Sequence, residues 1–272
     1  MKASKDPSKI NSNNEEFWDE PCGSTAFANL GFNSPAEFDK WYFDFYPYLE
    51  RFIPFDAFQG KKVLEVGLGF GSVSQKIIAS GASFHGLDIA RSPVDLVKDR
   101  LKVLNAKGSV CQGSVLECPW GDSYFDFVVS IGCLHHTGDF IAGIKEVHRV
   151  LKTGGTAVIM VYNAFSYRQW ITAPFTTFAQ IFNEFGKKPT PRQGGEKERF
   201  RYDSNKKKDA APCTQFIGKR GLMKILEAHF SEVVIRSENI GNSFFLRWLS
   251  RNQKLRYLGP IFGLDLYAVL KK

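Results

Sequence analysis

The stretch Lys62–Ala79, KVLEVGLGFGSVSQKIIA, decides the fold. Its aliphatic start, Val63–Val66, is typical of a short buried strand. Three glycines follow at Gly67, Gly69 and Gly71, and the apolar residues after them recur at helical spacing. A strand, a glycine turn and a helix in this order begin a nucleotide-binding α/β unit. The glycines allow positive φ and a close approach of the backbone to a ligand, and the free N–H groups of the helix start face the same ligand.

The glycine spacing distinguishes two kinds of nucleotide-binding loop. The dinucleotide pattern G-x-G-x-x-G requires a glycine at position 72, where this chain has Ser72, so an NAD-dependent dehydrogenase is disfavoured. The chain instead reads E-x-G-x-G-x-G, with Glu65 near the end of the strand. This pattern resembles motif I of the class I S-adenosylmethionine-dependent methyltransferases. The resemblance implies that Glu65 lies near the cationic methionine part of the cofactor.

Three further stretches resemble the same family, in the same order. Ser83–Ile89 resembles a second strand that ends in an acid. Asp88 stands about 20 residues beyond the glycine loop, where a carboxylate accepts hydrogen bonds from ribose hydroxyls. Phe125–His136 resembles the fourth strand and the loop after it, and Leu151–Met160 resembles the family's LKPGG turn and fifth strand, with Thr153 in place of proline.

The alternation of strands and helices predicts an α/β fold with a parallel sheet and right-handed crossovers. The resemblance, which covers about residues 60–162, implies a Rossmann-like methyltransferase sheet of seven strands with helices on both faces and the last strand antiparallel, between strands five and six. We expect an N-terminal arm and an aromatic cap helix in residues 1–58, and the methyltransferase domain in residues 59–272, with an insertion at 163–214. The expected elements are strands near 62–66, 82–87, 108–112, 231–236 and 262–270 and helices near 70–80, 93–105 and 216–230.

The composition favours a cytoplasmic protein with one large α/β domain. The 272 residues are 43% hydrophobic, and no apolar run approaches the ~20 residues of a membrane span. The N-terminus is polar and lacks the apolar core of a signal peptide. The five cysteines are scattered and match no metal-ligand spacing, so we expect reduced thiols and no metal site. The net charge of +8 permits an anionic substrate, a nucleic acid or an acidic membrane surface, and does not choose among them.

The N-terminal region is expected to contribute to the substrate side of the site. Residues 1–16 are polar and are expected to be loosely attached, whereas the aromatic segment Phe17–Ser24 either covers the cofactor mouth or packs elsewhere on the core. Ser34–Glu37, SPAE, is a helix start, and the helix should run to about Phe52. Its aromatic side chains either belong to the core or roof a pocket, and the polar tips most suited to reach a substrate are those of Tyr42, Tyr46 and Arg51.

Residues 163–214 form a long connection after the fifth strand, and such connections are often functional. The apolar spacing from Trp170 to Phe185 predicts a helix, and the basic part after it, which contains Gly194-Gly195, is expected to be a mobile loop. The insertion is either a substrate-recognition cap or a charged, solvated loop. The aromatic and basic segment at residues 244–259, FFLRWLSRNQKLRYLG, is compatible with a membrane interface, with a polyanion or with a purely structural connection.

Ligands of open α/β sheets bind beyond the carboxyl ends of the strands, which collects the cofactor residues in one cleft. The resemblance implies that Ile89 and Val115 sandwich the adenine ring. Ser114 stands where the family usually has an acid that contacts the adenine amino group, so this contact departs from the family pattern. The residues expected to bind the cofactor, S-adenosyl-L-methionine, are Glu65, Gly67, Gly69, Gly71, Asp88, Ile89, Ser114, Val115, Ser130 and Ile131.

His135 and His136 follow the fourth strand and are the expected catalytic residues. Methyl transfer requires the nucleophile to be held about 3 Å from the methyl group, with water excluded. A histidine can also remove a proton because its pKa lies near neutral pH. The alternative is that the histidine pair only shapes the pocket. The other side chains expected to contact the substrate are Tyr42, Tyr46, Tyr162 and Asn163.

These observations favour a methyltransferase that modifies an oxygen or nitrogen of a small, partly aromatic or apolar molecule. The chain lacks the Asn-Pro-Pro-Tyr signature of amino methylation on DNA or protein, which favours a small acceptor. The basic insertion supports the alternative of a methyltransferase of RNA or another polyanion. A non-catalytic module that kept the fold is a further alternative, which the intact glycines and acids argue against.

Overall fold

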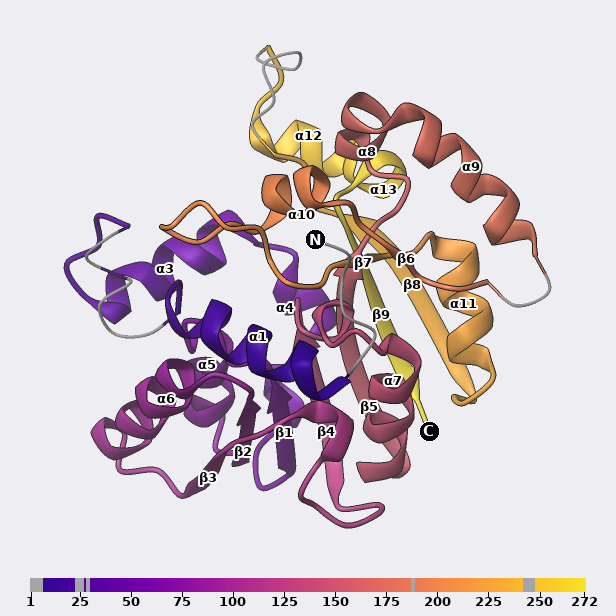
Figure 1. Cartoon of the computed structure of the whole chain (residues 1–272). Coiled ribbons are helices and arrows are strands. Elements are labelled where there is room, and N and C mark those ends of the chain that lie inside the picture. Colours follow the sequence, from indigo (N-terminus) through magenta and orange to yellow (C-terminus); the bar gives the residue numbers. More distant parts are fainter. Residues whose placement is uncertain (1–6, 23–26, 28–29, 187–188, 242–247) are drawn as a thin grey trace.

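A seven-stranded sheet runs through the molecule in the order β3-β2-β1-β4-β5-β9-β8 (Figure 1). The computed structural model describes residues 7–22, 27, 30–186, 189–241 and 248–272. The strands β1 to β5 pair in parallel, and β9 is antiparallel to both β5 and β8. The expected Rossmann-like sheet is therefore confirmed, with its antiparallel last strand. The strand bounds are β1 Lys62–Val66, β2 Ser83–Asp88, β3 Gly108–Gln112, β4 Phe125–Ile131, β5 Leu151–Tyr162, β8 Glu232–Glu238 and β9 Asp265–Lys271.

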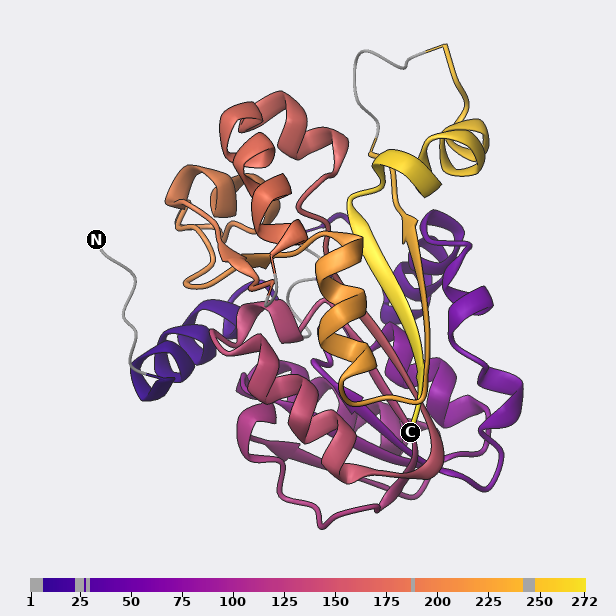
Figure 2. The ribbon, with the colours of Figure 1, turned by 90° about the vertical axis from the view of Figure 1, so that its right-hand side faces the viewer.

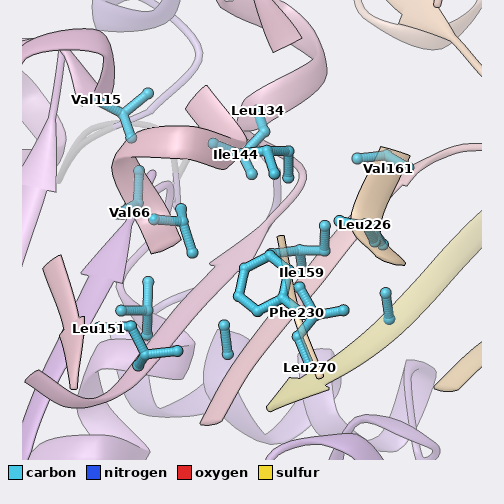
Figure 3. Close-up of a cluster of buried hydrophobic side chains, with 14 of the residues drawn as sticks. Val66, Val115, Leu134, Ile144, Leu151, Ile159, Val161, Leu226, Phe230 and Leu270 are labelled. Atoms are coloured by element: carbon cyan, nitrogen blue, oxygen red, sulfur yellow. The ribbon is translucent and has the colours of Figure 1, made fainter. Parts of the chain in front are cut away.

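Helices cover both faces of the sheet, so the central strands are apolar on both sides. On one face, α7 (Phe140–Val150) and α11 (Lys219–Glu227) pack against alternate residues of β1, β4, β5 and β9. Figure 3 shows side chains of this cluster, with Ile144 of α7 and Leu226 of α11 reaching toward Val66 and Ile159 of the sheet. The other face packs against α4 (Leu49–Phe52), α5 (Ser72–Ala79) and α6 (Arg91–Val103).

The aromatic cap helix is interrupted, contrary to expectation. It begins as expected, with the Ser34 hydroxyl accepting from the Glu37 N–H, but α3 spans only Pro35–Phe45 and is followed by the separate short helix α4. Pro47 explains the break, because proline lacks an N–H and excludes the helical conformation from the residue before it. Tyr46 accordingly has φ −115° and ψ 60°.

Two segments that were expected to lack regular structure contain helices. The N-terminal region forms α1, Pro7–Asp19, so the expectation of a loosely attached arm is wrong from Pro7 onward. In the insertion, the aromatic part is split by Pro174 into α8 (Tyr167–Thr172) and α9 (Pro174–Phe185). The basic part contains α10 (Glu196–Tyr202) and not a loop alone. A two-stranded sheet holds the insertion together, where β6 (Arg192–Gln193) pairs with β7 (Gln215–Phe216).

The two remaining helices, α12 (Arg251–Tyr257) and α13 (Gly259–Phe262), lie between β8 and β9. They stand at the same end of the molecule as α8, α9 and α10 in both views (Figures 1 and 2). This is the end at which β1, β2 and β4 finish. No helix in the described part of the chain is long and apolar enough to cross a bilayer.

A buried ion pair ties the cap helix α3 to the glycine turn. Arg100 of α6 donates to both carboxylate oxygens of Asp39, at 2.6 and 2.9 Å, and to the Phe70 carbonyl at 3.0 Å. The Ser72 hydroxyl donates to the same Asp39 at 2.6 Å. The side chains of Arg100 and Asp39 are 7% and 15% exposed, so the loss of either one leaves a buried charge without its partner.

We expect Arg100→Leu to lower the free energy of unfolding by about 3–5 kcal/mol, because Asp39 then stays buried and unpaired. The double variant Arg100→Leu with Asp39→Leu should lose less than the single variant. Urea unfolding followed by circular dichroism measures both. Arg91→Leu is the matched control, since Arg91 pairs with Asp95 at the surface and its loss should change little. A single variant no less stable than the control would contradict the prediction.

Candidate cofactor and acceptor site

The glycine turn brings the ends of β1 and β4 unusually close. Gly67, Gly69 and Gly71 all have positive φ, at 80°, 50° and 72°. A Cβ on Gly67 would lie 2.5 Å from Cys133 Cβ, so no larger residue fits at that point. A Cβ on Gly71 would lie 2.8 Å from Arg100 Nε. Gly67 thus shapes the cleft itself, whereas Gly71 makes room for the ion pair behind it.

A cavity of about 240 Å³ opens at the carboxyl ends of β1, β2, β3 and β4. Most of the residues expected to bind the cofactor line it, and these are Gly67, Gly69, Asp88, Ile89, Ser114, Val115 and Ile131. Ile131 also lines the second cavity described below. The structure therefore brings together residues that are more than 60 positions apart in the sequence.

Asp88 is held at the cavity wall by backbone donors. Its two carboxylate oxygens accept from the N–H groups of Leu68 at 2.6 Å and Ala90 at 2.9 Å. Burial raises the pKa of the Asp88 carboxyl to about 6, against the opposing effect of these backbone hydrogen bonds. The Ser114 side chain is also held by a backbone donor, because its hydroxyl oxygen accepts a hydrogen bond from the Leu116 N–H.

A smaller cavity of about 100 Å³ lies on the other side of the glycine turn, under Tyr42 of the cap helix. Glu65 lines it and accepts a short hydrogen bond from the Ser74 hydroxyl. Burial raises the pKa of Glu65 to about 8. A buried carboxyl with a raised pKa favours a cationic group beside it, because the positive charge would stabilise the ionised form of the carboxyl.

Seven of the expected site residues line neither cavity: Tyr46, Arg51, Gly71, Ser130, His135, Tyr162 and Asn163. Gly71 caps α5, and Ser130 is fully buried in the sheet. The Asn163 side chain is used within the fold, because its amide donates to the Gly263 carbonyl and its oxygen accepts from the Phe165 N–H. The Tyr46 ring packs on the Tyr42 ring, with 5.0 Å between the ring centroids, and does not itself line the smaller cavity. Arg51 faces away and pairs with Glu238.

The N-terminal helix α1 covers the larger cavity (Figure 1). Asn11, Asn14 and Trp18 all line it, as does Cys22 beyond the helix. The Asn14 amide donates to the His136 carbonyl at 2.7 Å, and its own oxygen is buried without a hydrogen-bond partner. Of the expected covering segment Phe17–Ser24, Trp18 and Cys22 therefore lie at the cavity, and residues 23–24 lie outside the described residues.

His136 sits where the cavity meets the insertion. Its Nδ1 is 2.7 Å from the Cys213 carbonyl, which can only accept, so Nδ1 carries the proton. Burial lowers the pKa of His136, which leaves Nε2 unprotonated at neutral pH. That nitrogen faces Asp203 Oδ2 at 3.7 Å, and this oxygen has no hydrogen-bond partner. Two hydrogen-bond acceptors thus face each other with no donor between them.

Aromatic rings and a second histidine enclose this pair. The Tyr162 hydroxyl donates to Asp203 Oδ1 at 3.0 Å, and burial raises the pKa of the Asp203 carboxyl. The His135 ring lies 4.1 Å from the rings of both His136 and Tyr162, and neither of its nitrogens has a hydrogen-bond partner. Burial lowers the pKa of His135 well below its ordinary value, so this ring is neutral.

Sequence reasoning missed Asp203 and Asn14. Asp203 lies in the basic segment that was expected to be a mobile loop, and no local pattern marks it as different from the other acids there. Asn14 lies in the polar N-terminal segment, where only Pro7 gives a helix-start signal. Among the described residues, no group of three or more His, Cys, Asp or Glu side chains is arranged to hold a metal ion.

Comparison with known proteins shows that the central part of the chain is similar to methyltransferases. Residues 64–159 match a family model described as a methyltransferase domain. The chain is 32% identical over 103 residues to the uncharacterized methyltransferase YdaC of Bacillus subtilis, a match over 37% of this chain and 56% of YdaC. It is 28% identical over 142 residues to the ubiquinone/menaquinone biosynthesis C-methyltransferase UbiE of Geotalea uraniireducens, over 50% and 57% of the two chains. The chain thus spans about half the length of the curated relatives it matches.

Solved structures share the fold over most of the chain. An S-adenosylmethionine-dependent methyltransferase from Mesorhizobium loti superposes with a TM-score of 0.57 at 14% identity, covering 83% of this chain and 96% of that one. The PH0226 protein from Pyrococcus horikoshii superposes with a TM-score of 0.54 at 18% identity, over 88% and 92% of the two chains. At these identities the likeness concerns the fold.

We expect the affinity for S-adenosylhomocysteine to fall about tenfold between pH 7 and pH 5, through the Asp88 pKa of about 6. The ionised carboxylate is the better acceptor for ribose hydroxyls, so affinity is complete above the pKa and is lost as pH falls through it. Calorimetric titration at several pH values measures this. Asp88→Asn should bind S-adenosylhomocysteine weakly, with an affinity that does not change between pH 7 and pH 5. If this variant keeps the pH dependence of the wild type, the titration belongs to another group.

We expect Gly67→Ala to abolish measurable binding of S-adenosylhomocysteine, because the methyl group would overlap Cys133 and displace the ends of β1 and β4. Gly60→Ala is the matched control, since Gly60 has φ 69° but nothing within 4 Å of the added Cβ. The control should lose only about 1–2 kcal/mol of stability from backbone strain and should keep its affinity. Equal binding by both variants would show that the close approach is not required.

Proposed function

We propose, from the class I S-adenosylmethionine-dependent methyltransferase domain that this chain carries, that the protein transfers a methyl group to an oxygen or nitrogen of a small, partly aromatic or apolar molecule. The observation that carries the proposal is the buried pair of acceptors, His136 Nε2 and Asp203 Oδ2, beside the larger cavity. A hydroxyl or amino group of the acceptor molecule would supply the donor that this pair lacks.

The residues around the two cavities fit S-adenosylmethionine. Glu65 and Tyr42 would hold the cationic methionine end, and the raised pKa of Glu65 is what a neighbouring cation would lower. Asp88 would hold the ribose, with the adenine between Ile89 and Val115. The unpartnered Asn14 oxygen adds a free acceptor at the cavity wall. When bound, the cofactor supplies a methyl group on a sulfonium, which is a good leaving group.

The protein's own part in the reaction would be to hold the acceptor molecule, exclude water and take up its proton. Burial raises the pKa of the Asp203 carboxyl and so makes it more basic than an ordinary aspartate, which is the direction that a proton acceptor requires. His136 would share that proton through Nε2 while the Cys213 carbonyl fixes its orientation. Tyr162, His135 and Trp18 would supply aromatic surfaces for an aromatic acceptor.

Methylation of a ring carbon is a second candidate reaction, favoured by the names of the relatives. These include demethylmenaquinone methyltransferases and the quinone C-methyltransferase UbiE. Removal of a proton from a ring hydroxyl makes the neighbouring ring carbons nucleophilic, so the same His136–Asp203 pair would serve transfer to oxygen and to carbon.

We expect Asp203→Asn to lower kcat by about 10²–10⁴-fold, the usual contribution of a general base, while the affinity for S-adenosylhomocysteine stays unchanged. The assay follows methyl transfer from labelled S-adenosylmethionine to hydroxylated aromatic probes such as a 1,4-naphthohydroquinone, and NMR of the product identifies the methylated atom. Asp209→Asn, an exposed acid of the same insertion, is the matched control and should retain full activity.

Two results would contradict the proposal at different points. If the wild-type protein does not bind S-adenosylhomocysteine, the methyltransferase activity itself is excluded. If it binds and turns over a probe but Asp203→Asn retains the rate, the assignment of the proton acceptor is wrong.

A further inference from the structure

Helix α9 buries polar side chains and exposes apolar ones, the reverse of an ordinary surface helix. The side chains that face the protein are polar, since Thr177, Gln180 and Glu184 are 0%, 4% and 3% exposed. The opposite side carries four phenylalanines that are 58–90% exposed, called here the phenylalanine face: Phe175, Phe178, Phe182 and Phe185. Surface helices of globular proteins bury their apolar stripe and expose the polar one. None of the described residues covers the phenylalanine face, and an exposed apolar patch of this kind favours a binding partner outside the protein.

Hydrogen bonds fix this orientation. The Glu184 carboxylate accepts from the N–H groups of Gly218 and Gly221 at the start of α11, in the role of a helix cap. The Lys224 ammonium donates to the Gly186 carbonyl at 2.9 Å, just beyond the end of α9. A rotation that buried the phenylalanines would break these bonds and expose their partners. The outward direction of the rings is therefore built into the fold.

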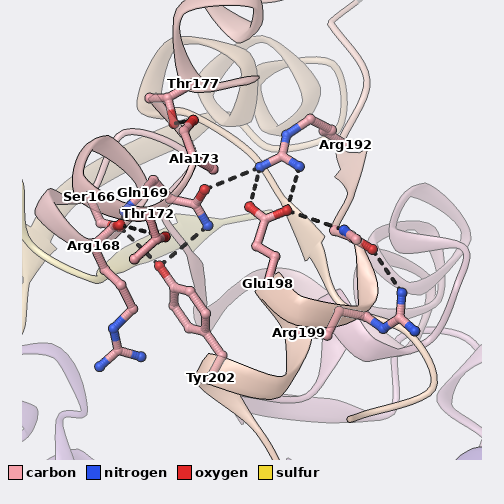
Figure 4. A network of polar contacts seen from close by, with 12 residues as sticks. Ser166, Arg168, Gln169, Thr172, Ala173, Thr177, Arg192, Glu198, Arg199 and Tyr202 are labelled. Carbon is pink, nitrogen blue, oxygen red and sulfur yellow. Dashed lines mark hydrogen bonds and ion pairs between the residues drawn. The ribbon is translucent and has the colours of Figure 1, made fainter. Parts of the chain in front are cut away.

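The layer between α8 and α10 is also polar. Arg192 forms an ion pair with Glu198 and donates to Gln169, which in turn contacts the Tyr202 hydroxyl (Figure 4). This network joins α8 to α10 through polar side chains. Ile171 of α8, shortly before α9 in the chain, is a further exposed apolar side chain at 60% exposure.

The insertion that carries the phenylalanine face is basic. Residues 163–214 contain ten basic and five acidic residues, and so supply five of the eight net positive charges of the chain. The Arg220 guanidinium lies over the Phe185 ring at 4.6 Å, and Arg201 donates to the Thr172 carbonyl beside Ile171. Cations placed around an exposed aromatic stripe match a bilayer with anionic headgroups. A second copy of this basic chain would instead bring like charges together.

We propose that the phenylalanine face docks the protein on the surface of an anionic lipid bilayer, with α9 lying among the headgroups. Helices α12 and α13, which carry the exposed side chains of Tyr257 and Ile261, stand at the same end of the molecule as α9 (Figures 1 and 2). The insertion that carries the face also carries Asp203. An apolar acceptor dissolved in the bilayer would therefore reach the site from the docked side, a step that rests on the proposed function.

Vesicle sedimentation tests the docking directly. The probes are vesicles of phosphatidylcholine alone and of equal amounts of phosphatidylcholine and phosphatidylglycerol. The wild-type protein should sediment with the mixed vesicles, with weaker binding at high salt and at least about tenfold weaker binding to phosphatidylcholine alone. The double variant Phe178→Ser with Phe182→Ser should lose binding to the mixed vesicles by about tenfold or more.

The double variant Val103→Ser with Val234→Ser is the matched control, because it removes two exposed valines of α6 and β8, outside the insertion, and should bind like the wild type. Calorimetry with S-adenosylhomocysteine tests whether each variant keeps the cofactor affinity of the wild type. The proposal is overturned if the wild type does not sediment with mixed vesicles, or if the phenylalanine variant still does. It is also overturned if light scattering finds a dimer that only the phenylalanine variant loses. Failure of the methyltransferase proposal would appear as a different result. In assays that contain no vesicles, the protein would neither bind the cofactor nor transfer a methyl group.

Discussion

The close approach of β1 and β4 at Gly67 is the constraint on which the rest of the site depends. With a Cβ at this position only 2.5 Å from Cys133 Cβ, the two strand ends would have to separate. The larger cavity lies on one side of this contact and the smaller one on the other, and Gly67 lines both. Because residues from β2, β3 and the loop after β4 are placed relative to these two strands, a shift here would move every wall of the cleft.

Buried polar contacts, in addition to apolar ones, attach the additional elements to this sheet. The buried pair of Arg100 and Asp39 joins the cap helix to the glycine turn, and Glu184 joins α9 to the start of α11. Hydrogen bonds and ion pairs have directions, so they hold an element in one orientation where apolar contact alone would permit several. At α9 this explains how four phenylalanines are kept outside against the hydrophobic effect.

The parallel strands of the sheet could be predicted from sequence because their signals are local, and the antiparallel last strand was implied by the family resemblance. Glycines, a strand-terminal acid at Asp88 and strands of five to twelve residues each stand within one continuous stretch. The acceptor side could not be predicted in the same way. Asp203 meets His136 from 67 residues away through an insertion whose path depends on buried polar pairs, and these have no periodic pattern.

Smaller errors have equally specific causes. The single long helix expected up to Phe52 ends at Phe45, because Pro47 acts on the backbone before it. The basic segment that lacked an apolar period nevertheless forms α10, which is stabilised by the Arg192–Glu198 pair and not by an apolar face.

The position of α1 has a consequence for the rate at which the protein can turn over. The helix covers the larger cavity and is held by a few contacts, among them the Asn14–His136 hydrogen bond and the bond from the Ser92 N–H to Asp19. Because the helix lies across the cavity, the opening of these contacts would widen the way out for spent cofactor. In an enzyme built this way, the strength of those few hydrogen bonds would contribute to the rate of product release.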